Sequence, residues 1–259
     1  MQYRYETHLH TCESSACGIS AARDYIPYYL DQGYHGIFVT DHFFGGNTAV
    51  SHRQPWRAQV DDFCRGYEAA REEGEKRGLQ VLFGWEQAYD GDEYLVYGLD
   101  KTWLYAHPEV KSYTRAEQYA AARAQGGCVV QAHPFRDRSY IRRIHLNTAC
   151  VDGVEVFNAA NPTEVNVQAY RYALNLGLPM LAGSDIHCAP WPTLSGIALE
   201  TPLHDEQDFA ARMRAAATIT LLAPVAELAS APVARVRLPW EVLGADGMPT
   251  DTPLAALLK

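Results

Sequence analysis

The sequence has no apolar run long enough to cross a bilayer, and its first residues do not resemble a signal peptide. We therefore expect a cytoplasmic protein without a membrane partner. Clustered positive charge is also missing: 31 acidic residues against 22 lysines and arginines give a formal net charge of −9. This balance argues against a general nucleic-acid binder, because phosphate backbones are held by clustered lysine and arginine. It leaves room for a small phosphorylated substrate, since bound divalent cations can supply positive charge.

Closely spaced cysteine pairs and two common catalytic loops are absent as well. There is no CxxC pair, no Gly-x-Ser-x-Gly elbow and no Gly-x4-Gly-Lys-Ser/Thr phosphate-binding loop. Disulfides are not expected in a cytosolic protein, so most cysteines are expected to be small buried residues, with Cys17 a separate case. The six cysteines are Cys12, Cys17, Cys64, Cys128, Cys150 and Cys188.

What is present is an alternation of strand-like and helix-like segments along most of the 259 residues. Strands are expected at 3–8, 36–40, 80–84, 94–98, 128–131, 153–157, 179–183, 196–199 and about 218–222. Helices are expected at about 20–32, 59–77, 114–125 and 163–175, and from Asp205 onward. This alternation predicts an α/β fold in which parallel strands form a closed or nearly closed barrel. We expect one main domain over residues 1–229 and a C-terminal extension over 230–259.

Histidines and carboxylates follow directly after several of the expected strands. Because the C-terminal ends of barrel strands converge on one face, these side chains are expected to meet there. A lone histidine at such a position is more often an ordinary hydrogen-bonded residue, but half of the ten histidines fall there. Imidazole and carboxylate ligands suit Zn, Mn or Fe, and sets of this size often hold two or three divalent ions. The predicted metal ligands are His8, His10, His42, Glu86, His133, Asp185 and His187.

The order of these motifs resembles the PHP family, named for polymerase and histidinol phosphatase domains. The motifs are His8-Leu9-His10, Thr40-Asp41-His42, the isolated Glu86, Ala132-His133-Pro134 and Ser184-Asp185-Ile186-His187. The resemblance extends from residue 7 to about 188. It implies a distorted (β/α)7-type barrel of parallel strands, with up to three metal ions at the C-terminal ends of the strands. Proteins with this site usually hydrolyse phosphate esters.

The resemblance also implies a role for each motif residue. His8, His10, Glu86 and Asp185 are expected to bind one ion, and Glu86 to bridge to a second ion held by His133. His42 and His187 are expected to help hold a third ion. Asp41 is expected to orient a neighbouring group or water rather than to bind metal.

Two positions depart from the family pattern. A histidine or aspartate often supplies a third-site ligand in the loop after the first motif, where this chain offers only Cys17 or Glu13. A second histidine often follows the bridging glutamate at the start of the next strand, where this chain has Tyr94. The second and third sites are therefore expected to be weaker than usual or completed by water.

The expected reaction is hydrolysis of a small phosphate monoester by a metal-bound hydroxide. Arg136, three residues after His133, is the candidate for a bidentate contact to the phosphate oxygens, although it could also be part of a solvated surface. Two alternatives remain open: a phosphodiesterase or exonuclease acting on short oligonucleotides, and a metal-binding domain without catalytic activity.

Overall fold

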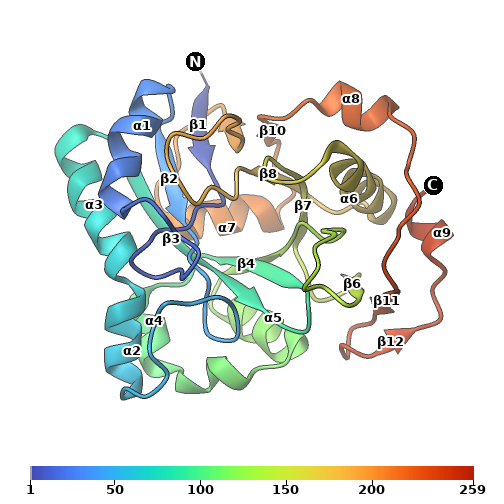
Figure 1. The fold of residues 1–259 in the computed structure, drawn as a ribbon, viewed down its shortest axis with the longest axis horizontal. Coiled ribbons are helices and arrows are strands. Elements are labelled where there is room, and N and C mark those ends of the chain that lie inside the picture. Colours follow the sequence, from blue (N-terminus) through green and yellow to red (C-terminus); the bar gives the residue numbers. More distant parts are fainter. Residues whose placement is uncertain (1) are drawn as a thin grey trace.

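The structure, a computed structural model, describes residues 2–259. Within these residues one nine-stranded sheet curves into a nearly closed barrel, with its strands in the order β10-β9-β1-β2-β3-β4-β5-β7-β8 (Figure 1). The strands are β1 (Tyr3–Glu6), β2 (Gly36–Val39), β3 (Gln80–Ala88), β4 (Glu93–Tyr97), β5 (Cys128–Ala132), β7 (Gly153–Asn158), β8 (Met180–Gly183), β9 (Ile197–Leu199) and β10 (Thr220–Leu221). The predicted barrel is confirmed.

The barrel closes beyond the named strands, at the end where the predicted ligands lie. Leu9 forms an isolated parallel bridge with Ile186, joining the segments that continue β1 and β8. The amide of His10 donates to the carbonyl of Ile186 at 2.9 Å. The first and last ligand motifs are therefore hydrogen-bonded to each other through their backbones.

The prediction that all barrel strands run parallel is wrong for part of the sheet. β4 is antiparallel to both β3 and β5, and β9 is antiparallel to β1 and β10. The cause at β4 is the short connection between Ala88 and Glu93, in which the amide of Tyr89 donates to the carbonyl of Asp92 at 2.9 Å. A parallel crossover needs about a dozen residues, so this connection can only make a hairpin.

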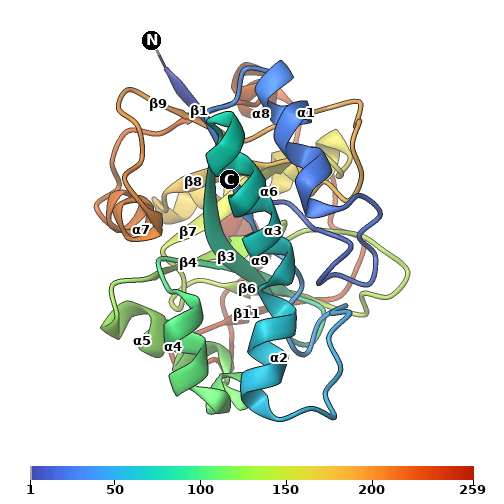
Figure 2. The same cartoon turned by 90° about the vertical axis from the view of Figure 1, so that its left-hand side faces the viewer.

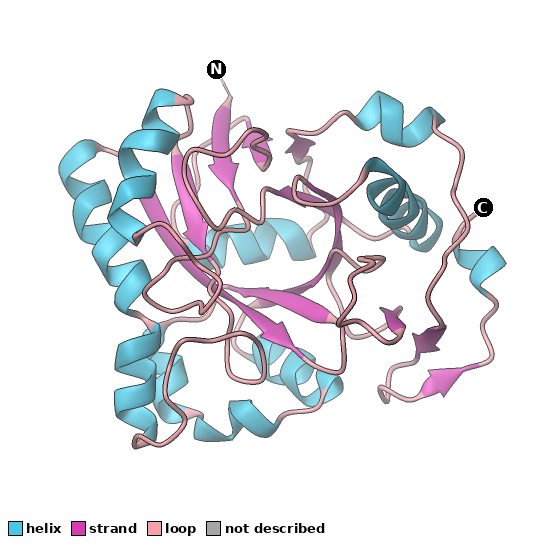
Figure 3. Ribbon diagram, in the orientation of Figure 1, coloured by secondary structure: helices cyan, strands magenta, loops and turns pink. Residues whose placement is uncertain are grey.

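Helices cover the outside of the sheet, as Figure 3 shows in cyan, and Figure 2 shows α3 lying across β3. The predicted helix at 59–77 is two helices that meet at Cys64, and the other predicted helices are present within a few residues of their expected limits. The helices are η1 (Ala22–Asp24), α1 (Tyr25–Asp31), α2 (Trp56–Phe63), α3 (Arg65–Arg77), α4 (Lys101–Ala106), η2 (Pro108–Ser112), α5 (Arg115–Ala124), α6 (Thr163–Leu176), α7 (Glu206–Arg214), α8 (Val225–Ser230) and α9 (Leu254–Leu257).

The break between α2 and α3 brings their junction against the loop that follows β1. Ser14 donates its hydroxyl to the carbonyl of Phe63 at 2.7 Å. A Cβ atom on Gly66 would lie 2.2 Å from the Thr11 hydroxyl oxygen, so only glycine allows this approach. The junction thus fixes the loop that carries the residues after His10.

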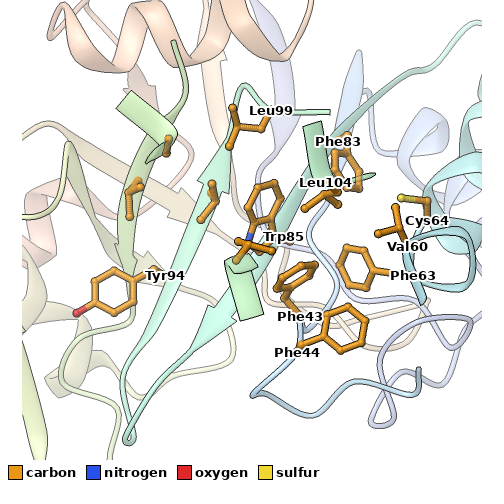
Figure 4. Close-up of a cluster of buried hydrophobic side chains, with 14 of the residues drawn as sticks. Phe43, Phe44, Val60, Phe63, Cys64, Phe83, Trp85, Tyr94, Leu99 and Leu104 are labelled. Carbon is orange, nitrogen blue, oxygen red and sulfur yellow. The ribbon is translucent and has the colours of Figure 1, made fainter. Parts of the chain in front are cut away.

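A cluster of buried aromatic side chains fills the space between β3 and the neighbouring helices. Phe43 packs edge-on against Phe63 with ring centroids 4.9 Å apart, and it lies 5.4 Å from the ring of Trp85. Figure 4 shows these rings together on one side of β3 and β4. Burial of such large rings stabilises the strand ends on which the site is built.

Residues 230–259 form a separate edge beside α6, at the right of Figure 1. Strand β11 (Trp240–Leu243) pairs in parallel with β6 (Ile144–Asn147) and antiparallel with β12 (Pro249–Thr250). Among residues 2–259, no helix combines the length and the hydrophobicity needed to cross a membrane.

Candidate metal centre

The seven predicted ligands lie together at one end of the barrel. Together with Glu93, their donor atoms form four overlapping groups, and within each group all atoms are within 4.8 Å of one another. Six of the seven side chains are buried, and His187 is partly exposed. The groups are His8–Glu86–His133, His8–His10–Asp185, His10–His42–His187 and His42–Glu86–Glu93.

The innermost group joins the first and last motifs to Glu86. His8 Nε2 lies 3.3 Å from Glu86 Oε1 and 3.5 Å from Asp185 Oδ1. His10 Nε2 lies 3.2 Å from the same Asp185 oxygen and 3.5 Å from Glu86 Oε2. Four side chains from three different strand ends therefore direct donor atoms at one point.

Backbone strain occurs at two residues of this centre. His133 has a φ of 27° and Asp185 a φ of 54°, a left-handed region that residues other than glycine rarely adopt. Such conformations cost of order 1–3 kcal/mol each and concentrate at functional sites. Here they turn each side chain into the cluster directly after a buried strand.

Residues behind the cluster fix which ring nitrogen faces it. Glu155 Oε1 lies 2.8 Å from His8 Nδ1. The Ser15 hydroxyl donates a hydrogen bond to Asp41 Oδ1 at 2.6 Å. The Ser15 oxygen can therefore accept a hydrogen bond from His10 Nδ1 at 3.2 Å. Both histidines then present Nε2 to the cluster as an unprotonated donor. Asp41 has the orienting position expected for it.

Glu155 was not among the predicted site residues. It also accepts hydrogen bonds from the His133 amide at 3.1 Å and from Asn158 Nδ2 at 3.0 Å. A carboxylate within a buried strand of otherwise mostly apolar residues was the available signal, because such a charge needs a partner.

Glu93 is the second residue that sequence reasoning missed. It begins β4, and its carboxylate lies 3.6 Å from His133 Nε2 and 3.9 Å from His42 Nδ1. Burial raises the pKa of Glu93, and the negative charge of Glu86 raises it further. Since β4 runs antiparallel to β3, its first residue, rather than its last, lies at the ligand face.

The expectation that Tyr94 occupies the position of a ligand is wrong. Successive side chains of a strand point to opposite faces, so Tyr94 points away from the cluster that Glu93 faces. Its hydroxyl donates to Asp92 Oδ2 at 2.6 Å, and its ring is visible at the edge of the close-up in Figure 4. Glu93, rather than Tyr94, therefore lies at the position where the family pattern places a second ligand.

The remaining histidines of the cluster stack closely. The His10 ring lies 4.2 Å from that of His42 and 4.4 Å from that of His187. Burial and the neighbouring charge of His42 hold the pKa of His10 well below its usual range. Burial would also lower the pKa of His42, but Glu86, together with Cys17 and Glu93, outweighs this effect and raises that pKa.

Charge balance in the cluster fits bound cations. Burial alone would raise the pKa of Glu86, but the neighbouring His8 and His42 hold it well below its usual value. His42 Nδ1 and Glu86 Oε2 lie 2.8 Å apart, yet neither makes a well-directed hydrogen bond within residues 2–259. A buried imidazole nitrogen and a buried carboxylate oxygen held this close are an arrangement that a shared cation would stabilise.

The two candidate residues of the loop after His10 differ in their surroundings. Both carboxylate oxygens of Glu13 accept from the amide of Ala22, at 3.0 and 3.1 Å, away from the histidines. Cys17 lines the same cavity as His42 and His187. Burial would raise the pKa of the Cys17 thiol, but these two imidazoles outweigh it and lower it to about 6.

The spacing of Cys17 and Arg23 also matches the Cys-x5-Arg pattern of covalent phosphatases. In the structure, however, Arg23 is an exposed partner of Glu72 at 2.6 Å. Because the guanidinium pairs outside the cluster, the two residues do not form an anion-binding loop.

Arg136 is buried beside the cluster rather than on a solvated surface. Its Nη2 donates to Asp185 Oδ2 and, at 3.3 Å, to Asn158, while Nε donates to Asn161 at 3.1 Å. Burial would raise the pKa of Asp185, but Arg136 and then His8 hold that pKa well below its usual value. Arg136 thus keeps a predicted ligand ionised.

A cavity of about 640 Å³ opens directly onto the cluster. Its inner wall includes His42, Glu93, Arg136, Asp185 and His187. The lining also includes apolar and aromatic side chains and one further cation, among them Ile19, Tyr89, Arg138, Tyr140 and Trp191.

The five histidines outside the strand ends lie in none of the four donor groups among residues 2–259. His35 packs against Tyr3 and accepts from the Arg4 amide, and His204 pairs with Asp205 on the surface. His107 stacks on Trp103, His52 packs on Phe44, and His145 lies between Asp92 and Glu241.

No family model and no curated protein matches this sequence. Solved structures do match the fold. A protein from Bifidobacterium adolescentis described as a metal-dependent phosphoesterase is similar with a TM-score of 0.53 and 18% identity, over 83% of this chain and 97% of that one. A two-domain protein from Bacteroides vulgatus that contains a PHP-like metal-dependent phosphoesterase gives 0.56 and 15%, over 83% of this chain and 63% of that one.

The lesion-specific endonuclease EndoQ from Pyrococcus furiosus is also similar, with a TM-score of 0.51 and 12% identity, over 85% of this chain and 58% of that one. This chain therefore matches less than two thirds of the Bacteroides and Pyrococcus proteins. At these identities the likeness concerns the fold. It confirms the predicted α/β barrel fold.

Proposed function

We propose that the protein is a metal-dependent phosphoesterase that hydrolyses a small phosphate monoester. The observation that carries the proposal is the convergence of seven predicted ligands and Glu93 within four overlapping donor groups. The similarity of the barrel to metal-dependent phosphoesterases supports the same reaction class.

The donor groups divide into positions for two or three divalent ions. His8, His10, Glu86 and Asp185 would hold one ion, and Glu86 would bridge to a second that His133 and Glu93 complete. His42 and His187 offer imidazoles for a third position. Mixed imidazole and carboxylate ligands suit Zn, Mn or Fe.

Bound ions would neutralise the charged oxygens of a phosphate ester and lower the pKa of a water molecule. The chain's own residues prepare the centre for this chemistry. Glu155 and Ser15 hold the His8 and His10 rings in the required tautomer, and Arg136 keeps Asp185 ionised. Arg136 also lines the cavity, where its guanidinium can contact a phosphate oxygen.

The cavity and the charge of the chain favour a small substrate. A volume of about 640 Å³ accommodates a phosphate with a modest organic group. Among the lining residues only Arg136 and Arg138 carry a permanent positive charge, whereas a bound nucleic-acid strand requires a basic groove.

The test is to load purified protein with Zn, Mn or Fe and to assay phosphomonoesters, phosphodiesters and short oligonucleotides in parallel. We expect two or three ions per chain by elemental analysis and fastest hydrolysis of a monoester. Full activity in protein that contains no metal would refute the proposal.

The same assay decides between the alternatives. Preferential cleavage of diesters or oligonucleotides would favour a nuclease, the second candidate, which the similarity to the endonuclease from Pyrococcus supports. Stoichiometric metal binding without any hydrolysis would favour a non-catalytic metal-binding domain.

A further inference from the structure

We propose that Glu6 is a positioning residue of the metal centre. Its carboxylate holds the backbones of the first and last ligand motifs at the separation that His8 and Asp185 need to bind one ion. Glu6 itself belongs to none of the four donor groups found among residues 2–259. The inference rests on the proposed metal centre and names a residue that sets its affinity for metal without contacting the metal.

One carboxylate oxygen of Glu6 joins the two motifs. Glu6 is the last residue of β1, two residues before His8, and its side chain is fully buried. Its Oε1 accepts hydrogen bonds from the amides of Thr7 and His8, each at 2.9 Å. The same oxygen accepts from the amide of Ser184, also at 2.9 Å. Because Ser184 directly precedes Asp185, this oxygen ties the backbone of one ligand motif to that of the other.

The carboxylate spans a place where the sheet itself is open. Strands β1 and β8 are not hydrogen-bonded neighbours within residues 2–259, and the segments that continue them meet at the Leu9–Ile186 bridge. One of the two amide hydrogen bonds at this bridge is long, at 3.4 Å. The Thr7 hydroxyl spans the same gap by donating to the Ala182 carbonyl at 2.7 Å. Side chains, with Glu6 foremost, thus replace the ladder of backbone hydrogen bonds that joins paired strands.

The two motifs approach each other closely across this gap. A Cβ atom on Gly183 would lie 2.6 Å from the Cβ atom of His8, so only glycine allows the approach. His8 Nε2 and Asp185 Oδ1 lie 3.5 Å apart. Metal ligands must lie within about 0.2 Å of their bonding distances. Loss of the acceptor at Glu6 would leave three amides unpaired and let the two backbones separate, which weakens the binding of an ion between these side chains.

The second carboxylate oxygen of Glu6 has a different partner. Its Oε2 accepts from the hydroxyl of Tyr29 in α1 at 2.7 Å. Tyr29 is fully buried and contacts neither ligand motif through this hydrogen bond. The two oxygens therefore separate the roles of Glu6: Oε1 positions the ligand motifs, and Oε2 anchors the carboxylate to a helix.

Manganese(II) titration of the metal-free full-length protein, followed by electron paramagnetic resonance, tests this assignment without an activity assay. Free manganese(II) gives a sharp spectrum that is lost on binding, so the titration reports the number of bound ions and their dissociation constants. Glu6→Met fills a similar volume but offers the three amides no good acceptor. We expect its affinity for the tightest-bound ion to fall by about 10- to 100-fold, the loss typical of residues that orient metal ligands.

Two further variants make the result specific. Glu6→Gln removes the charge but keeps an oxygen for the three amides, and its own amide nitrogen can donate to the Tyr29 oxygen. It should restore manganese affinity to near that of the unmodified protein. Tyr29→Phe is the matched control, because it removes only the hydrogen bond to Oε2. It should lower the melting temperature, as Glu6→Met does, without weakening manganese binding.

The outcomes separate this inference from the proposed function. Unchanged manganese affinity in folded Glu6→Met would overturn the role of Glu6 while leaving the proposed metal centre intact. Equal weakening in Glu6→Met and Tyr29→Phe would also overturn it, because the loss would then follow stability alone. Failure of the unmodified protein to bind any manganese would refute the metal centre and this inference together.

If Glu6→Met does not fold, Glu6→Asp takes its place in the comparison. Its carboxylate is one methylene shorter, so it can still reach the adjacent Thr7 amide but not the amide of Ser184 in the other motif. We expect weaker manganese binding in Glu6→Asp than in Glu6→Gln. The reverse order would show that the charge of Glu6, rather than its reach, is what the centre requires, and would overturn the inference.

Discussion

Glu86 contacts histidines from three separate segments of the chain. Its oxygens lie 3.0 Å from His133 Nε2, 3.3 Å from His8 Nε2 and 2.8 Å from His42 Nδ1. Glu86→Gln keeps the shape but removes a buried negative charge from between them. We expect phosphatase activity to fall by more than about 100-fold, beyond the loss typical of groups that only orient a ligand.

The matched control is Glu75→Gln, which changes an exposed glutamate that pairs with Arg71 within α3. Activity should stay near that of the unmodified protein. Circular dichroism of both variants should show the same helix content. Equal activity in the two variants would contradict the placement of Glu86 at the centre.

Glu155 lies behind the predicted ligands and contacts two of them, His8 and His133. Glu155→Gln can still accept from the His133 amide, but its hydrogen bond to His8 Nδ1 loses its charge. We expect metal affinity to weaken by about 10- to 100-fold, with catalysis recovered at saturating metal. Competition with a metal-binding dye measures the affinity. Loss of activity that excess metal does not restore would show a role beyond positioning.

At the scale of elements, the hairpin of β3 and β4 determines the composition of the centre. Ala88 pairs with Glu93 and Glu86 pairs with Leu95, so the start of β4 lies beside the end of β3. This reversal brings a third carboxylate, Glu93, to the cluster that contains Glu86 and Asp185. A β4 that ran parallel to its neighbours would place Tyr97 at that face instead.

Helix α5 illustrates an element whose stability is independent of the centre. Thr114 and Glu117 form a capping box, in which Glu117 Oε2 accepts from the Thr114 amide at 2.8 Å. Thr114→Ala removes the hydroxyl that accepts from the Glu117 amide. We expect a loss of about 1 kcal/mol in the free energy of unfolding, measured by denaturant titration, with metal content unchanged. A fall in metal content would show that α5 supports the ligands directly.

At the scale of the whole molecule, the centre joins the two ends of the barrel sequence. Motifs from residues 8–10 and 185–187 meet there, and buried charges of one sign, such as Glu86 and Glu93, lie close together. A metal that binds only the folded chain stabilises it by about 4 kcal/mol at a thousandfold excess over its dissociation constant. We expect chelation to lower the melting temperature, and added Zn or Mn to restore it.

Scanning calorimetry at several metal concentrations measures this effect. The melting temperature should rise with metal concentration, since binding is linked to folding. A metal with a poor match to the ligands, such as Ca, should restore little of the stability. A melting temperature that does not change on chelation would contradict the proposed centre.

The sequence alone determined the alternation of strands and helices, and with it the barrel. It also determined which histidines and carboxylates follow buried strands, because strand ends can be read from local hydrophobic patterns. The His8–His10 spacing and the Asp185–His187 spacing predict side chains on one face for the same local reason. The structure brings all seven of these residues together.

Only the tertiary structure decided what depends on strand direction and on packing at a distance. Because β4 runs antiparallel to β3, Glu93 rather than Tyr94 faces the cluster. The position of β7 places Glu155 against His8. The position of the Glu13 carboxylate depended on the Ala22 amide and on the path of one loop. These contacts join segments whose relative placement is set by the closed sheet, which no local pattern encodes.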